Sequence, residues 1–244
     1  MKVIKVLGAF FIMRSRYGLI LIFALILPLQ GLFALDIRVT EGKLGFNFTA
    51  EYNRTFHFCQ DYAIFGGIEL NNRYSFKAGA ALGKIGSETE IKFLGSGRVT
   101  PFTGIPLNLN LSYIYNGLPG FQMHSHNILF YLSYDWRRGG IALGFNFRNT
   151  SFFGETSLFE PLPVYSMYFN FLNTDRFILG IRCSNFSLFY VGSLGQISFS
   201  LNGILRLNQH WSLSNELVMT QSGNTFFAAT FYRFAYTGGL RFSW

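Results

Sequence analysis

The stretch LGFNFTAEY, residues 44–52, alternates apolar and polar side chains without a break. Leu44 and Phe46 stand at even positions, and Asn47 and Glu51 stand at odd ones. Successive side chains of a β-strand point to opposite faces, so this stretch predicts a strand with one apolar and one polar face. The same period of two recurs over residues 74–82, 107–113, 141–147 and 197–207.

The character of the two faces favours a membrane protein. Half of the 244 residues are hydrophobic, 19% are aromatic and 13% are charged. A soluble β-sandwich also alternates, but long aromatic faces opposite faces of Gly, Ser and Asn are typical of strands between lipid and a polar lumen. No apolar run in residues 35–244 reaches the length of a membrane helix. In lipid the remaining structure that satisfies every backbone group is a closed sheet. We therefore predict an all-β fold, a closed antiparallel transmembrane β-barrel.

Turn signals divide the chain into twelve predicted strands, and an even number leaves both termini of the chain on the periplasmic side. The predicted strands cover residues 43–53, 62–70, 73–83, 88–95, 105–116, 125–136, 140–150, 163–172, 176–192, 196–207, 211–221 and 225–244. Ten strands is the alternative. A change of phase at Ser184-Asn185 predicts a β-bulge within the ninth strand. Short periplasmic turns are expected to alternate with longer external loops at 54–61, 117–124 and 151–162.

Residues 1–34 have the layout of a secretory signal peptide, and an uncleaved anchor is the alternative. A basic leader precedes the apolar core 19–27 and small residues close to Ala34. This segment holds 4 of the 20 basic residues and none of the 12 acidic ones, so residues 35–244 carry a net charge of +4. No Lys/Arg-rich run for binding nucleic acid stands in residues 35–244. We predict a signal peptide over 1–34 and the barrel over 35–244.

The last six residues, GLRFSW, place Leu240, Phe242 and Trp244 on one face. Here the sequence resembles bacterial outer-membrane β-barrel proteins, whose last strand ends this way. The resemblance implies a location in the bacterial outer membrane. It also implies that these three residues form the signal read by the barrel-assembly machinery. Strand addition to an unpaired edge is a physical basis for such reading.

The polar faces define a set of charged residues predicted to line the lumen. They are Glu51, Glu69, Arg73, Lys77, Asp135, Arg148, Arg176, Arg182, Arg206, Glu216, Arg233 and Arg241. Eight basic residues against four acidic ones give this set a net charge of +4. One hypothesis is a water-filled passage with a weak preference for anions, since arginines lower the barrier to negative solutes. The other is an Arg–Glu network that cross-braces a filled interior.

Few residues suggest catalysis or metal binding. His124 and His126 share a face, which could seat a metal or serve a Ser–His hydrolase of the barrel phospholipase type, but no third ligand is evident. Both histidines are in phase with apolar residues that face outward. A position at the membrane–water interface therefore fits them better than a metal-binding or catalytic role. A protease would need paired acids and a His at the rim, and only His57 and Asp61 stand together, in one predicted loop. We predict no catalytic residue, no metal site and no cofactor.

Two further groups of residues receive structural interpretations. Lys84, Glu88, Glu90 and Lys92 are interpreted as a solvated loop. Cys59 and Cys183 do not make a disulfide framework, and whether they pair is left open.

The leading functional hypothesis is a porin-like outer-membrane channel for small solutes, with a weak anion preference. The alternatives are a barrel enzyme of the phospholipase or protease type and a closed structural or surface-interaction barrel. The expected partners are membrane lipid, the barrel-assembly machinery and small-molecule solutes, with no nucleic acid.

Overall fold

The computed structural model describes residues 39–53, 57–102, 104–153, 155–156, 160–192, 195–222 and 230–244. Twelve long strands make up this part of the chain: β1 (Val39–Asn53), β2 (His57–Leu70), β3 (Tyr74–Ile85), β4 (Glu88–Val99), β5 (Leu107–Leu118), β6 (Met123–Trp136), β7 (Gly139–Phe152), β9 (Glu160–Asn173), β10 (Phe177–Ser184), β11 (Gln196–Arg206), β12 (Trp211–Ser222) and β13 (Thr230–Ser243). A two-residue strand, β8 (Glu155–Thr156), and a 3-10 turn, η1 (Pro119–Phe121), complete it. The expected signal peptide, 1–34, lies outside the described residues.

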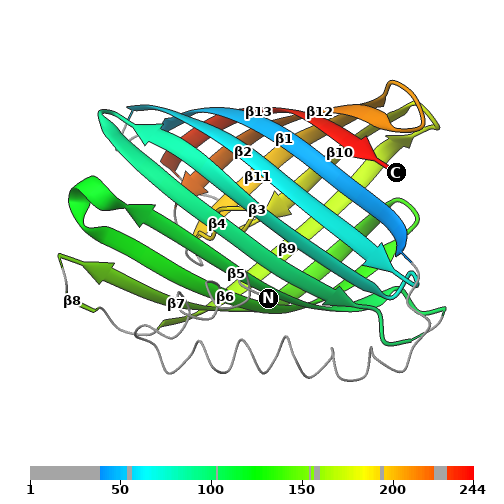
Figure 1. Cartoon of the computed structure of the whole chain (residues 1–244), viewed down its shortest axis with the longest axis horizontal. Helices are drawn as coiled ribbons and strands as arrows, with labels where there is room; N and C mark the ends of the chain where they lie inside the picture. Colours follow the sequence, from blue (N-terminus) through cyan, green and yellow to red (C-terminus); the bar gives the residue numbers. More distant parts are fainter. Residues whose placement is uncertain are drawn as a thin grey trace, which may run out of the picture. The chain divides into compact units, whose positions relative to one another are not determined.

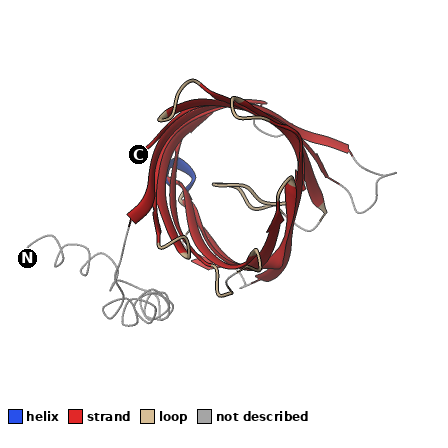
Figure 2. Ribbon diagram, turned by 90° about the vertical axis from the view of Figure 1, so that its right-hand side faces the viewer, coloured by secondary structure: helices blue, strands red, loops and turns tan. Residues whose placement is uncertain are grey.

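The strands close into one antiparallel barrel (Figures 1 and 2). Each long strand pairs with the next along the chain, and β13 pairs with β1 to close the ring. The closing register sets Leu44 opposite Phe242, and Gly42 exchanges two backbone hydrogen bonds with Trp244. Closure leaves no unpaired edge, as lipid requires. The predicted fold, a closed antiparallel barrel of twelve strands, is confirmed.

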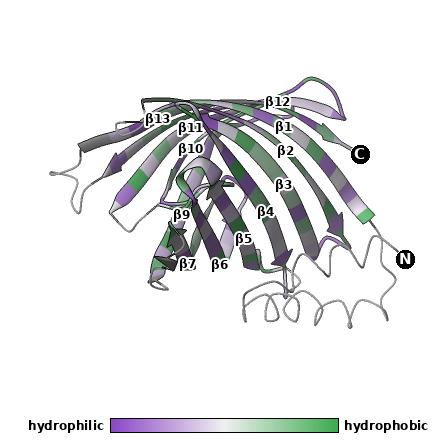
Figure 3. Cartoon of the chain, turned by 60° about the vertical axis from the view of Figure 1, so that its left-hand side comes forward, coloured by the Kyte–Doolittle hydropathy of each residue, from purple (hydrophilic) through white to green (hydrophobic). Residues whose placement is uncertain are grey.

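Hydrophobic and hydrophilic residues alternate along the strands in Figure 3, so the two faces of the barrel differ in character. Large apolar side chains stand exposed on the outside of every long strand, for example Phe46, Leu143 and Leu217 at 49%, 63% and 41% exposure. Polar side chains such as Asn110 and Asn146 are buried on the inside. Such an exterior is stable only against lipid. No helix in the described part of the chain is long and apolar enough to cross a membrane.

Three predicted features of the strands and loops are wrong in detail. β2 begins at His57, so Asp61 belongs to a strand and not to a loop. Glu88, Glu90 and Lys92 belong to β4, which runs four residues further than predicted, to Val99. Three connections at this end of the barrel, 54–56, 86–87 and 119–122, are accordingly short and join their strands with two to four residues, whereas those that follow β7, β10 and β12 are longer. Charged residues had suggested solvated loops there, but a polar lumen accepts charges within a strand.

The predicted ninth strand, 176–192, is also wrong. β10 ends at Ser184, and the change of phase at Ser184-Asn185 marks the end of the strand, not a bulge within it. Beyond it the chain turns back on itself, with Phe186 paired to Val191 in an isolated bridge. Residues 185–192, the lumen hairpin, fold into the barrel; a loop inside the ring of strands is visible in Figure 2.

The lumen hairpin packs on an unusual apolar patch inside the barrel. Leu94, Ile114, Leu129 and Val164 lie on the inner faces of β4, β5, β6 and β9, where polar residues are the rule. Together with Val191 of the hairpin they form the buried core of the described residues, each less than 10% exposed. The interior is therefore filled on this side.

Candidate functional site: the lumen

A cavity of about 780 Å³ occupies the lumen beside the hairpin. Its charged lining consists of Lys43, Lys77, Lys92, Arg98, Arg182, Arg206, Arg241, Glu41, Asp61, Glu69, Asp135 and Glu216. Seven basic residues against five acidic ones give the lining a net charge of +2. The lining is positive, as the sequence predicted, but its net charge is smaller than the +4 of the predicted set.

The structure divides the twelve residues predicted to line the lumen into three groups. Seven of them line the cavity: Glu69, Lys77, Asp135, Arg182, Arg206, Glu216 and Arg241. Glu51, Arg148 and Arg233 lie on the inner face of their strands but do not line the cavity. Glu51 pairs with Arg233, and both arginines contact the lumen hairpin. Arg73 and Arg176 do not line the lumen, because they lie exposed in the turns after β2 and β9. Strand ends cannot be located to a residue from alternation alone, and both arginines stand at such ends.

Several lumen charges are neutralised by ion pairs. Lys92 Nζ lies 2.8 Å from Asp61 Oδ2 and 2.7 Å from Glu90 Oε2, and all three side chains are largely buried. Arg233 Nη2 lies 2.6 Å from Glu51 Oε2. These pairs belong to the cross-bracing network that was one of the two hypotheses for the lumen.

A second group of lumen cations makes no ion pair with any described residue. It consists of Lys77 on β3, Arg182 on β10 and Arg241 on β13, together with Arg206 at the end of β11, which donates to Asp175 O at 3.1 Å. The Nε atoms of Arg182 and Arg241 are buried and have no hydrogen-bond partner among the described residues. Arg98, Lys43 and Arg241 are near enough to Lys77 to repel its charge, and Glu69 is near enough to attract it. The carboxylates of Glu69 and Glu216 offset part of the charge of Lys77 and Arg241, and the lining keeps a net charge of +2.

Five charged residues of the cavity were missed in the sequence: Glu41, Lys43, Asp61, Lys92 and Arg98. A signal for two of them was present. Lys92 and Arg98 are in phase with Leu94 and Ser96, so the alternation of β4 already assigns them to one face.

The lumen hairpin is anchored at its start by Asn185, which is 1% exposed. Its Nδ2 donates to Pro163 O at 2.8 Å, and its Oδ1 accepts from Tyr165 N at 2.8 Å. Its backbone N also donates to Tyr165 O at 3.1 Å. The side-chain amide therefore satisfies the β9 backbone groups where β10 leaves the sheet.

Charged residues of the barrel wall hold the far end of the hairpin. A guanidinium nitrogen of Arg148 donates to Val191 O. Arg233 lies over the ring of Tyr190, 4.7 Å from its centroid, and the Tyr190 hydroxyl donates to Gln196 Oε1 at 2.8 Å. Within the hairpin, Ser187 N donates to Tyr190 O at 2.7 Å. The hairpin is thus a fixed part of the interior, held at both ends.

The histidine pair lies on the outer face of β6. Tyr113 and His126 are joined by a 2.7 Å hydrogen bond between the hydroxyl and Nδ1, and the His124 and His126 rings lie edge to face. Ser125 lies between them in sequence and so on the opposite face of the strand. No group of three metal-ligating side chains occurs in the described residues. The contacts are those of aromatic residues at a membrane interface.

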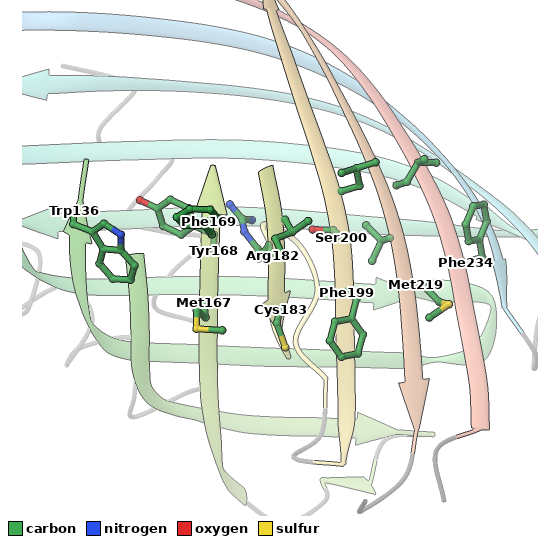
Figure 4. Close-up of a pocket in the computed structure, with 14 residues that line it drawn as sticks. Trp136, Met167, Tyr168, Phe169, Arg182, Cys183, Phe199, Ser200, Met219 and Phe234 are labelled. Carbon is green, nitrogen blue, oxygen red and sulfur yellow. The ribbon is translucent and has the colours of Figure 1, made fainter. Parts of the chain in front are cut away.

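A second hollow, of about 620 Å³, lies along β9 to β13 (Figure 4). Met167, Phe199 and Met219 in its lining point away from the lumen, as the register of their strands requires. Cys183 also lines this hollow, whereas Cys59 lies on the inner face of β2, so the two side chains lie on opposite faces of the barrel wall. An apolar hollow of this kind suits the acyl chains that surround any membrane barrel.

No protein-family model matches the sequence, and neither does any curated protein. Solved structures match the fold. The structure described as the KdgM porin in complex with disordered oligogalacturonate has a TM-score of 0.56 and 7% identity, and the match covers 83% of this chain and 99% of that one. A NanC porin structure has a TM-score of 0.55 and 8% identity, with 81% and 98% covered. The outer membrane phospholipase (OMPLA) dimer from Salmonella typhi has a TM-score of 0.48 and 7% identity, with 86% and 93% covered; this likeness is too low to support a shared activity.

The lipid-facing exterior, the closed ring of twelve strands and these matches agree on one kind of protein. They confirm the resemblance predicted from the last strand and the predicted location in the bacterial outer membrane. The chain is a bacterial outer-membrane β-barrel protein, and its fold resembles that of the small KdgM and NanC porins.

Proposed function

We propose that the barrel is a passive channel for small solutes with a weak preference for anions, and that it is not an enzyme. The observation that carries this proposal is the group of unpaired lumen cations, Lys77, Arg182 and Arg241, in the wall of the cavity. The Nε atoms of Arg182 and Arg241 are buried without a partner, which is costly, so a sequence that retains these groups suggests a role for them. Mobile anions that pass through the lumen would supply the missing negative charge.

The ion pairs of Lys92 and Arg233 support a weak preference over a strong one. Those pairs brace the wall and add little net field. The lining as a whole carries only two positive charges more than negative ones. The structural likeness to a porin described in complex with oligogalacturonate is consistent with passage of an organic anion, although at 7% identity that likeness establishes the fold alone.

The test is the reversal potential of single channels in a planar bilayer under a tenfold KCl gradient. The wild-type protein is expected to give reproducible conductance steps with anion selectivity. In water, a unit charge about 8 Å from the ion contributes about 0.5 kcal/mol, so each of Lys77→Gln, Arg182→Gln and Arg241→Gln should lower the anion-to-cation permeability ratio about twofold.

Arg137→Gln and Arg176→Gln are the matched controls, because both arginines lie exposed in turns. They should change the permeability ratio far less than the lumen substitutions do. A folded barrel that carries no current, or one whose selectivity is indifferent to all three lumen cations, would overturn the proposal.

A further inference from the structure

The cavity beside the lumen hairpin has two chemically different sides. One side carries the unpaired cations Lys77 and Arg241 on β3 and β13. The other is formed by Phe186, Leu188 and Phe189 of the hairpin, all of which line the same cavity. Apolar side chains inside a membrane channel are unusual, because inner faces of open barrels are polar.

The apolar side lies close to the cationic side. A Cβ atom built on Gly79 would lie 3.3 Å from the Cζ of Phe189, so this ring reaches across to β3. Gly79 is two residues from Lys77 and therefore shares its face of the strand. The ring of Phe186 lies 5.1 Å from that of Tyr131, a residue within electrostatic reach of Arg98 and Arg182.

The hairpin is built to hold its apolar side in place. Val191 is buried in the inner core at 7% exposure. Asn185 and Arg148 fix the two ends by hydrogen bonds. Leu188, at the tip, is the exception: it takes no part in the core, is 36% exposed and lines the cavity. A solute in the cavity therefore meets a pre-organised apolar surface and charged groups together.

We infer that the lumen hairpin makes the passage selective among anions, favouring small organic carboxylates that carry an apolar face over equally charged but fully polar ones. The carboxylate would lie toward Lys77 and Arg241, and the apolar face would lie against Leu188 and Phe189. Contact between apolar surfaces releases water and stabilises the solute in the passage, whereas a polyhydroxylated anion would lose hydration there without a matching partner. This inference rests on the proposed channel function and adds the solute class.

The test compares benzoate with gluconate, two monovalent organic anions, by bi-ionic reversal potentials across the same bilayer. The wild-type channel is expected to pass benzoate better than gluconate. Leu188→Asn keeps the approximate size of the side chain but removes its apolar surface, and should lower the benzoate-to-gluconate permeability ratio roughly threefold. Leu188→Met keeps an apolar surface and should leave the ratio near the wild-type value.

Phe189→Ser is the second variant, because its effect does not depend on Leu188. Leu207→Ser is the control: Leu207 is 54% exposed and lies in the β11–β12 turn. A benzoate-to-gluconate ratio unchanged in both hairpin variants would overturn the inference.

The two proposals fail in different ways. Anion-selective currents without a benzoate preference would overturn the solute class and leave the channel intact. Absent currents, or currents selective for cations, would overturn both.

Discussion

A guanidinium nitrogen of Arg148, on β7, donates a hydrogen bond to the carbonyl oxygen of Val191, 43 residues away at the end of the lumen hairpin. The same side chain is oriented by Asn127, whose Oδ1 accepts from Arg148 Nε at 3.0 Å. Arg148 was predicted from the sequence to attract anions. The structure shows that it also holds the lumen hairpin in place.

Replacing Arg148 by Lys separates these two roles. The charge is retained, but a lysine cannot reproduce the fork of donors that reaches Asn127 and Val191 together. We expect the open-channel noise and the mean conductance to rise because the hairpin loosens, while the reversal potential in a KCl gradient stays unchanged. Arg206→Lys, at an exposed strand end, is the control. A quiet Arg148→Lys channel with altered selectivity would assign Arg148 to the ion path instead.

Asn185→Ala should destabilise the barrel. The substitution leaves Pro163 O and Tyr165 N without their side-chain partners at a site that is 1% exposed. Leaving buried polar groups unsatisfied costs about 1–3 kcal/mol each, so we expect the free energy of unfolding to fall by roughly 2–4 kcal/mol.

Urea unfolding in lipid vesicles, followed by tryptophan fluorescence, measures this loss. Asn173→Ala is the control, because Asn173 is exposed at the end of β9, and it should change stability by less than about 0.5 kcal/mol. Equal effects of the two substitutions would mean that Asn185 does not anchor the hairpin.

Lys92→Met should cost far more stability than Lys43→Met. Lys92 lies between Asp61 and Glu90 at 13% exposure, so its loss leaves two carboxylates close together without a cation. Removing one partner of a buried pair costs about 3 kcal/mol or more. Lys43 pairs with Glu41 at 2.7 Å but is 51% exposed, and a pair of that kind contributes less than about 1 kcal/mol.

The same urea titration measures the free energy of unfolding of both lysine variants. The triple variant Lys92→Met, Asp61→Asn, Glu90→Gln is expected to regain much of the lost stability, because no unpaired charge remains. A triple variant that is no more stable than Lys92→Met would argue against electrostatic repulsion as the cause.

The strand pattern could be predicted from sequence because lipid and lumen impose opposite demands on alternate residues. Leu44 and Phe46 face outward as their phase requires. The lumen hairpin could not be predicted in the same way. Ser184-Asn185 changes phase, but a bulge and a strand end produce the same local signal. What distinguishes them is the amide of Asn185 bonding to β9, a contact between segments about twenty residues apart.

The inner core was also beyond the sequence pattern. Leu94 and Ile114 occupy inward positions although they are apolar. From alternation alone, such residues cannot be distinguished from an irregular pattern or from a strand shifted by one residue. They become interpretable once Val191 is known to cover them. Apolar residues at inward positions on several neighbouring strands are therefore a usable signal for a segment folded into a barrel.

The closing seam between β13 and β1 yields the last prediction. Trp244 N and O exchange hydrogen bonds with Gly42 at 3.1 Å, and the Trp244 ring stacks on that of Phe242 at a centroid distance of 5.8 Å. Trp244→Ala keeps the backbone pairing but removes the aromatic contacts that hold the end of the seam. We expect slower closure of the barrel, seen as a lower yield of the heat-modifiable folded band per unit time when the unfolded protein is added to vesicles.

Leu143→Ala is the matched control for this seam effect, because Leu143 is 63% exposed to lipid in the middle of β7, far from the seam in strand order. It removes lipid-facing apolar surface away from the seam and should leave the folding rate nearly unchanged. In the presence of barrel-assembly machinery the difference in folding rate between the two variants should widen. We expect that machinery to recognise the face formed by Leu240, Phe242 and Trp244. A Trp244→Ala protein that folds as fast as Leu143→Ala in both settings would show that the seam closes through its backbone pairing alone.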